Sequence, residues 1–173
     1  MDLLEIMRKR RSIRQYTGEH IAEEAVNRIL QAGLLSPSGR GVRPWEFIVV
    51  RDKSMLQAMA GCRVGAAEML KGADCAIVVL GDGEKTDVWV EDCSIAMSNM
   101  HLMADSLGVG SCWIQGRLRD AEEGTTEACL RTRLGFPANY RLEAILSLGM
   151  PAVRPEARKL EELPMEKVHW EKF

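Results

Sequence analysis

Apolar positions recur along the chain with two different spacings, which predict helices and strands in alternation. Near the N-terminus, Leu3, Ile6 and Met7 fall at i, i+3 and i+4, which is the spacing of one helix face. The runs FIVV and CAIVV are rich in β-branched residues, as buried strands are. The pattern predicts helices over residues 2–9, 21–35, 55–60, 87–107 and 121–134, and strands over 47–50, 72–83, 111–114 and 141–149. This alternation indicates an α/β or α+β sheet layered with helices, in a single domain over residues 1–173.

Two stretches depart from the pattern of an ordinary surface element. The predicted helix 87–107 is apolar around much of its circumference, so we expect it in the middle of the protein. The tail over 151–173 is rich in Pro and charge, and it carries no convincing core pattern before VHW at 168–170. Such a segment has little reason to be ordered alone, so we expect this C-terminal arm to pack on a second subunit.

The overall composition is typical of a soluble globular protein, with 46% hydrophobic and 28% charged residues and a formal net charge of -2. No apolar run approaches the roughly 18 residues that a membrane span needs. The N-terminus places its basic residues after its apolar ones and carries Asp2 and Glu5, unlike a signal or transit peptide. We therefore expect a cytoplasmic protein without a membrane partner.

The five cysteines (Cys62, Cys75, Cys93, Cys112 and Cys129) are spread along the chain without any C-x-x-C pair. This distribution predicts reduced thiols buried as small hydrophobic residues, rather than a disulfide framework or an iron–sulfur or zinc site. The three histidines lie far apart and show no metal-ligand spacing. We predict no metal site.

A basic stretch, RKRRSIR, occupies residues 8–14 of this slightly acidic chain. If the backbone is extended here, Arg10, Ser12 and Arg14 point the same way, because side chains alternate along a strand. Two guanidiniums around a hydroxyl suit a phosphate, which arginine binds through charge-assisted hydrogen bonds. A solvated basic face is the ordinary alternative. Nucleic acid is disfavoured, because the basic density ends at Arg14 and no aromatic residues are interleaved for stacking.

Four motifs in order resemble the nitroreductase family of FMN-dependent oxidoreductases. They are RRSIRQY near the N-terminus, SPSGRGVRPWEFIVV, the helix and strand of VEDCSIAMSNMHLMADSLGVGSCWIQG, and the closing RLEAILSLGMPAVRPEARKLEELPMEKVHW. The resemblance covers nearly the whole chain. It implies an α+β fold, an α/β/α sandwich with a mixed, mostly antiparallel central sheet. It also implies an interlocked homodimer with two flavins at the interface and exchanged C-terminal arms.

The resemblance implies a phosphate site for FMN at the N-terminal motif. Family members contact the ribityl phosphate with this stretch, which here contributes Arg10, Arg11, Ser12 and Arg14. The alternation supports three of these residues independently, whereas Arg11 rests on the resemblance alone. A basic residue of the arm usually completes the site. Arg158 is the best match, and Lys159 is the second candidate.

Two further segments carry flavin contacts by resemblance. In SPSGRGVRPW, Pro37, Ser38, Gly39 and Arg40 match a loop that a partner subunit lays against the isoalloxazine ring. Gly41 and Arg43 stand where the family commonly has Asn and Gln, so the substrate class does not transfer. In the strand end WIQG, Trp113, Ile114, Gln115 and Gly116 match the segment against the other face of the ring, where a backbone N–H bonds flavin N5.

The implied function is an oxidoreductase that takes a hydride from NADH or NADPH onto flavin N5. It then reduces a second small molecule, such as a nitroaromatic or a quinone, in ping-pong order. The cofactor carries the chemistry, so we assign no catalytic acid or base. The alternatives are a flavin carrier or sensor without turnover, and a same-fold dehalogenase or flavin-fragmenting enzyme.

Overall fold

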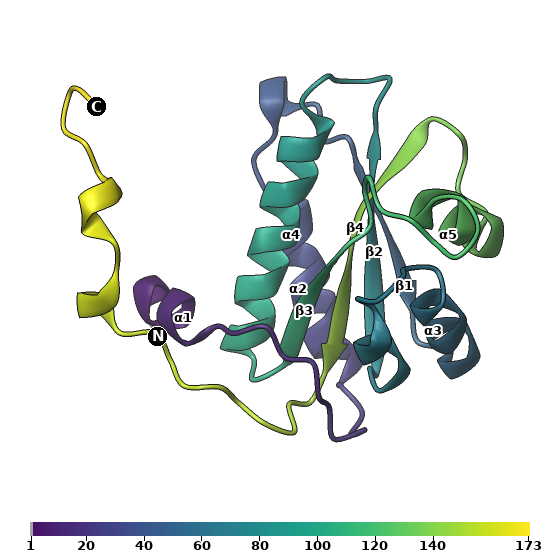
Figure 1. Cartoon of the computed structure of the whole chain (residues 1–173), viewed down its shortest axis with the longest axis horizontal. Helices are drawn as coiled ribbons and strands as arrows, with labels where there is room; N and C mark the ends of the chain where they lie inside the picture. Colours follow the sequence, from purple (N-terminus) through teal and green to yellow (C-terminus); the bar gives the residue numbers. More distant parts are fainter. Residues whose placement is uncertain (1) are drawn as a thin grey trace.

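The computed structural model describes residues 2–173, which form helices on both sides of a sheet (Figure 1). The helices are α1 (Leu3–Lys9), α2 (Glu23–Leu34), α3 (Lys53–Ala60), α4 (Trp89–Ser106) and α5 (Thr126–Leu134). The strands are β1 (Trp45–Val50), β2 (Cys75–Asp82), β3 (Gly110–Gln115) and β4 (Tyr140–Gly149). None of the helices in this described part is long and apolar enough to cross a membrane.

The sheet has the order β1-β2-β4-β3, and all three neighbouring pairs are antiparallel. The N-terminal segment adds a short parallel contact at the β3 edge, where Ser12 pairs with Ser111. The antiparallel character agrees with the prediction, whereas the predicted mixture of directions is limited to this isolated bridge outside the four strands. Between Val79 and Leu80 the β2–β4 register shifts, so Glu143 of β4 lies in a bulge.

Each face of the sheet carries its own apolar core. Along β2, Ile77 and Val79 pack with α2 and α4, whereas Val78 and Leu80 pack with α3 and α5. A strand covered on both faces needs apolar residues throughout, which explains why the CAIVVL run does not alternate with polar positions. Figure 1 shows these three layers, which confirm the predicted α+β sandwich.

The long helix α4 lies against the sheet with α2 beside it (Figure 1). Its buried residues include Met97, Met100 and His101, whose spacing of i, i+3 and i+4 places them on one face of the helix. The prediction that the apolar segment 87–107 occupies the middle of the protein is confirmed, with ends shorter by one or two residues.

The predicted helix over 121–134 begins later than its sequence pattern indicates. Helix α5 starts at Thr126, because the Thr125 side chain accepts a hydrogen bond from the Ala128 N–H and caps the helix. The preceding Gly124 has a positive φ of 72°, which breaks any helix reaching it from residue 121.

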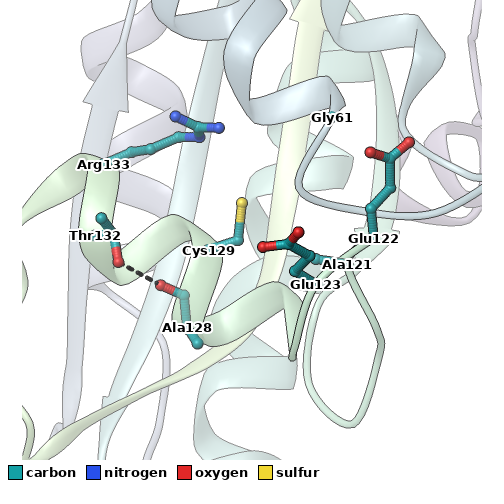
Figure 2. Close-up of a pocket in the computed structure, with 8 residues that line it drawn as sticks. All are labelled: Gly61, Ala121, Glu122, Glu123, Ala128, Cys129, Thr132 and Arg133. Carbon is teal, nitrogen blue, oxygen red and sulfur yellow. Dashed lines mark hydrogen bonds between the residues drawn. The ribbon is translucent and has the colours of Figure 1, made fainter.

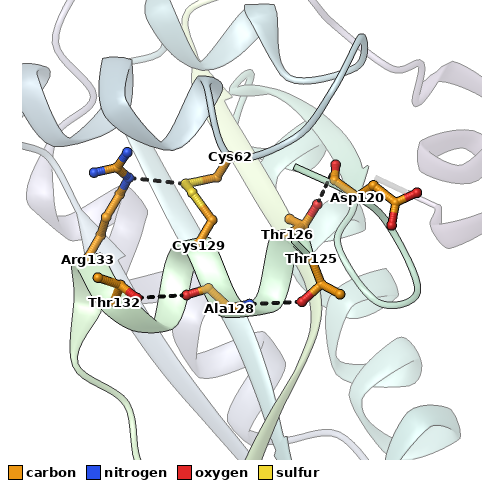
Figure 3. Close-up of a disulfide and its surroundings, with 8 residues drawn as sticks. All are labelled: Cys62, Asp120, Thr125, Thr126, Ala128, Cys129, Thr132 and Arg133. Atoms are coloured by element: carbon orange, nitrogen blue, oxygen red, sulfur yellow. Dashed lines mark hydrogen bonds between the residues drawn. A yellow bond between two sulfur atoms is a disulfide. The ribbon is translucent and has the colours of Figure 1, made fainter. Parts of the chain in front are cut away.

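The prediction that all five cysteines are reduced thiols is wrong for two of them. Cys62, just after α3, and Cys129, in α5, form a disulfide with a Cα–Cα distance of 5.5 Å (Figure 3). They are 67 residues apart in sequence, and only the packing of α3 beside α5 brings them together. Cys75, Cys93 and Cys112 are buried free thiols, as predicted.

The C-terminal arm leaves the sheet at Pro151 and runs away from the layered body, beside α1 (Figure 1). Its root is fixed by Arg154, whose guanidinium donates to the Gly108 carbonyl at 2.6 Å and pairs with Asp105 at 3.3 Å. Beyond that anchor almost every arm residue is exposed, and Trp170 keeps 87% of its surface accessible. Large exposed aromatic residues favour a second surface for the arm, so the expectation that it packs on another subunit stays a prediction.

Candidate functional site

The basic N-terminal segment leaves α1 and runs extended along the edge of β3. The Ile13 N–H donates to the Ser111 carbonyl at 2.9 Å, and the Ile13 side chain is buried. The Tyr16 hydroxyl holds the same segment by donating to the Ile13 carbonyl at 2.9 Å. Because Ile13 points inward, Ser12 and Arg14 point outward, which agrees with the predicted alternation.

The thiol of Cys112 in β3 lies within the electrostatic influence of the predicted phosphate-binding residues. Burial raises the pKa of its thiol, while Arg14, the hydroxyl of Ser12 and Arg10 all oppose the rise. All three residues thus act on the same thiol at the β3 edge.

A cavity of about 440 Å³ opens beside this thiol. It is lined by Arg14, by Cys112, Trp113, Ile114 and Gln115 of β3, by Arg63 and Arg119, and by Gly65, Ala66, Glu68 and Met69. Three guanidiniums against one carboxylate make the lining cationic. The structure thus brings the N-terminal motif and the WIQ segment together at one cavity, although they are about a hundred residues apart in sequence.

The backbone of β3 offers hydrogen-bonding groups to the same cavity. Ile13 donates to the outward carbonyl of Ser111, whereas the Gly116 N–H faces β4 and donates to the Glu143 carbonyl. By alternation, the N–H groups of Trp113 and Gln115 face the open edge, away from β4. The Arg63 guanidinium donates a hydrogen bond to the Gln115 carbonyl at 3.1 Å. An edge of this kind can bind the polar rim of a flat ligand.

The side chains of the WIQG segment point in different directions. The Trp113 indole N–H donates to the Gln115 side-chain oxygen at 2.8 Å, which orients both residues on the α4 side. Ile114 is buried on the opposite face, where it packs in the core under α3 and α5. Gly116 is needed for packing, because a Cβ there would lie 2.4 Å from Leu142 Cδ2.

We expect Gly116→Ala to lower the free energy of unfolding by about 1–3 kcal/mol, the usual effect of overpacking a core. The melting temperature of the flavin-free protein measures this effect without any contribution from binding. Gly72→Ala is the matched control, since a Cβ at Gly72 meets nothing within 4 Å. Equal stability of the two variants would contradict the packing role of Gly116.

His101 lies behind the basic segment and is almost fully buried. Its Nδ1 is 2.7 Å from the Ser111 hydroxyl. Burial, together with the nearby Arg10 charge, lowers the pKa of His101 to about 4. The imidazole is therefore neutral near pH 7 and adds no charge to the cationic site.

Arg11 and Arg158 lie away from the cavity, against the arm. The Arg11 guanidinium donates to the Glu156 carbonyl. The Arg158 N–H donates to the Arg8 carbonyl, and the Arg8 guanidinium donates to the Arg158 carbonyl, both at 3.1 Å. The Arg158 side chain is exposed, as is that of the alternative residue Lys159. Within one chain the arm thus follows the basic segment, but neither candidate residue lines the cavity.

The loop after α2 stands apart from this cavity as well. The Gly39 N–H donates to the buried Asp92 carboxylate of α4 at 2.7 Å, and the Ser38 hydroxyl accepts from the Arg43 N–H at 2.9 Å. Arg40, at a positive φ of 54°, is exposed and lies 3.4 Å from Asp87. Pro37 is exposed. The four predicted loop residues therefore do not reach the cavity of their own chain.

Sequence reasoning missed Arg63 and Arg119, which line the cavity. Arg63 is an isolated basic residue in a turn, and Arg119 follows the strand end within another turn. Neither forms a motif, so only the folded backbone shows that both face Arg14 across the cavity. Asp92 and Glu143 were also missed. Each is buried with one carboxylate oxygen lacking a partner among residues 2–173.

Burial raises the pKa of Glu143, against the opposing effects of the Ser94 hydroxyl and Arg117. The ionised form is therefore disfavoured in the folded state, and stability should rise as the pH falls through the folded-state pKa. We expect Glu143→Gln, whose side chain stays neutral, to have a melting temperature a few degrees above that of the wild type near pH 8. The difference should be smaller near pH 5. Thermal melts at both pH values, with the exposed Glu19→Gln as control, measure this difference. A gain independent of pH would contradict the assignment.

The fold is a layered α+β sandwich, and Arg14 of the N-terminal segment lines one cationic cavity together with the outer strand β3. The model of the Nitroreductase family matches residues 7–62 and 56–150. The chain therefore belongs to the nitroreductase family.

Individual relatives agree over the full length. A protein of Archaeoglobus fulgidus named as an NADH dehydrogenase/NAD(P)H nitroreductase is 36% identical over 177 residues, covering 99% of each chain. The structure of an FMN-dependent nitroreductase from Clostridium difficile R20291 matches with a TM-score of 0.95 and 42% identity, over 98% of this chain and 99% of that one. A nitroreductase from Desulfovibrio desulfuricans, solved in complex with FMN, gives 0.82 and 30% identity, over 100% and 98%. These likenesses confirm the predicted family and fold.

Proposed function

We propose that this protein is an FMN-dependent oxidoreductase that takes reducing equivalents from NADH or NADPH and delivers them to a second small molecule in ping-pong order. The observation that supports the proposal is the cationic cavity at the edge of β3, which Arg14 lines together with Arg63 and Arg119. The names of the relatives given above indicate FMN as the cofactor and NADH or NADPH as the reductant. Nitroaromatics and quinones are the candidate acceptors. We place the reaction in the cytoplasm, where both nicotinamide nucleotides are available.

The residues at the cavity fit FMN. Arg14 at the cavity, with Arg10 and Ser12 just before it in the chain, would supply guanidiniums and a hydroxyl for the phosphate, and the outward N–H groups of Trp113 and Gln115 suit the polar rim of the ring. When bound, FMN would supply the hydride-transfer chemistry that the side chains of this chain lack. The chain's own part is to hold the phosphate, orient the ring along β3 and surround both with positive charge. The cationic lining would stabilise negative charge on a group bound there.

We propose a homodimer in which each subunit completes the other's site. The loop residues Pro37–Arg40 lie away from their own cavity, as expected if they serve the partner. Leu3, Leu34, Leu35 and Ile95 expose between 40% and 84% of their surface on α1, α2, its end and α4. Apolar residues gathered on one side of the body suit an isologous interface, in which the same surface of both subunits is buried.

The test begins with the purified, yellow protein under anaerobic conditions. Addition of NADH or NADPH should bleach the flavin absorbance, and a nitroaromatic or a quinone should then restore it in a separate step. A yellow protein that neither nucleotide reduces would overturn the enzyme assignment in favour of a carrier or sensor. Halide release from a halogenated aromatic, without nitro reduction, would favour the same-fold dehalogenase instead.

A further inference from the structure

The disulfide between Cys62 and Cys129 lies outside the site described above, on the α3 and α5 side of the sheet (Figure 3). Its two sulfur atoms differ in access. Cys62 is fully buried, whereas Cys129 is partly exposed and lines a cavity of about 560 Å³ that Cys62 does not line. A thiol that enters this cavity therefore meets Cys129 first.

A cationic group stands beside the buried sulfur. The Nε of Arg133 donates a hydrogen bond to Cys62 Sγ at 3.2 Å (Figure 3). When a disulfide is attacked, the sulfur that is not attacked leaves as a thiolate, and a better stabilised thiolate leaves faster. A guanidinium at this distance stabilises negative charge on Cys62. The accessibility of Cys129 and the stabilisation of Cys62 as the leaving thiolate thus both favour attack on Cys129.

The charged residues of the cavity lining affect which thiols can approach Cys129. Figure 2 shows Glu122 and Glu123 on one side of Cys129 and Arg133 on the other. The remaining lining residues are Gly61, Ala121, Ala128 and Thr132, which are small and uncharged. Two carboxylates at the approach to Cys129 repel an anionic thiol and attract a cationic one.

We propose that Cys62–Cys129 is a thiol–disulfide exchange centre for small uncharged or cationic thiols. A thiolate attacks Cys129 Sγ, forms a mixed disulfide there and breaks the existing S–S bond, so that Cys62 leaves as a thiolate beside Arg133. A second thiolate then attacks the mixed disulfide and leaves Cys129 as a thiolate. Two thiols are oxidised to one disulfide, and the protein gains two electrons and, after protonation, two protons.

The experiment uses the full-length protein, purified without reductant, and three probes at equal thiolate concentration: cysteamine, 2-mercaptoethanol and 2-mercaptoethanesulfonate. Acid quenching, alkylation and mass spectrometry follow the mixed disulfide and the final dithiol, which is about 2 Da heavier before alkylation. We expect the adduct on Cys129 and the rate order cysteamine, mercaptoethanol, mercaptoethanesulfonate. The double change Glu122→Gln and Glu123→Gln should remove most of this order.

Arg133→Gln should slow exchange roughly tenfold, because the leaving sulfur loses a charge-assisted hydrogen bond. Arg28→Gln, on the exposed side of α2, is the matched control and should react as wild type does. Adducts on Cys62, equal rates for the three thiols in the wild type, or free thiols at both positions in the oxidised protein would each overturn the proposal.

Single-cysteine variants test the access argument separately. In native Cys62→Ser protein, Cys129 should be alkylated rapidly by iodoacetamide, whereas Cys62 in Cys129→Ser protein should react slowly. Equal reactivity of the two thiols in folded protein would contradict the assigned direction of attack. None of these readouts involves flavin, so failure here leaves the proposed oxidoreductase function untouched, and the reverse also holds.

Discussion

Replacing Arg14 with alanine should weaken FMN binding by roughly 10–100-fold, the range that corresponds to losing a hydrogen bond to a charged group. Arg14 lines the cavity beside β3, so its guanidinium can bind a phosphate that enters there. Flavin per subunit after gel filtration, and the dissociation constant from fluorescence titration of the apoprotein, measure the effect.

Two further variants sharpen this prediction. Arg14→Lys should fall between the wild type and the alanine variant, because it keeps the charge but loses the bidentate geometry of guanidinium. Arg28→Ala, which removes an exposed cation from α2, should bind FMN as the wild type does. If all three variants retain flavin equally, the phosphate does not lie at the N-terminal motif.

Truncation of the chain after Val153 should impair dimer formation and flavin retention together. The removed arm carries Arg154, which anchors the arm to α4, and the Glu156 carbonyl that binds Arg11 of the basic segment. Truncation removes the contacts that Arg8 and Arg11 make with the arm. It also removes Arg158, the arm residue expected to complete the phosphate site. Sedimentation analysis and flavin absorbance follow the two losses in one preparation.

The separate change Arg154→Ala distinguishes the anchor from the rest of the arm. It removes the contacts with Gly108 and Asp105 but keeps all residues from Pro155 onward, so it should weaken the dimer less than truncation does. Circular dichroism controls for unfolding, because the sheet and its two cores lie outside the removed residues. A truncated protein that remains a flavin-loaded dimer would show that the arm serves neither purpose.

Most of the helices and strands could be predicted because each depends on local spacing, whereas the assignment of the site residues stays a prediction. Buried strands such as β2 and the apolar helix α4 show their burial in consecutive residues, and the alternation in Arg10, Ser12 and Arg14 shows a shared direction. The resemblance added the WIQG segment, which the structure places at the same cavity. The start of α5 was missed because Gly124 and the Thr125 cap interrupt an otherwise helical composition.

The remaining features depend on contacts between distant segments. Cys62 and Cys129 carry no spacing signal, and only the packing of α3 beside α5 sets their Cα atoms 5.5 Å apart. Arg63 and Arg119 reach the cavity from two separate turns, so no linear motif reveals them. Gly116 depends on a distant residue in the same way. Leu142 of the neighbouring strand leaves no room for a side chain at position 116, and sequence spacing alone does not show this contact.

The open edge of β3 has a consequence for the behaviour of the protein in solution. An outer strand with unsatisfied N–H groups is a template for pairing with another copy of itself, and sheet proteins ordinarily protect such strands. Arg14, Arg63 and Arg119 line the cavity at this edge, and we expect their mutual repulsion to keep copies apart. High salt screens that repulsion, so flavin-depleted preparations should precipitate more readily as ionic strength increases.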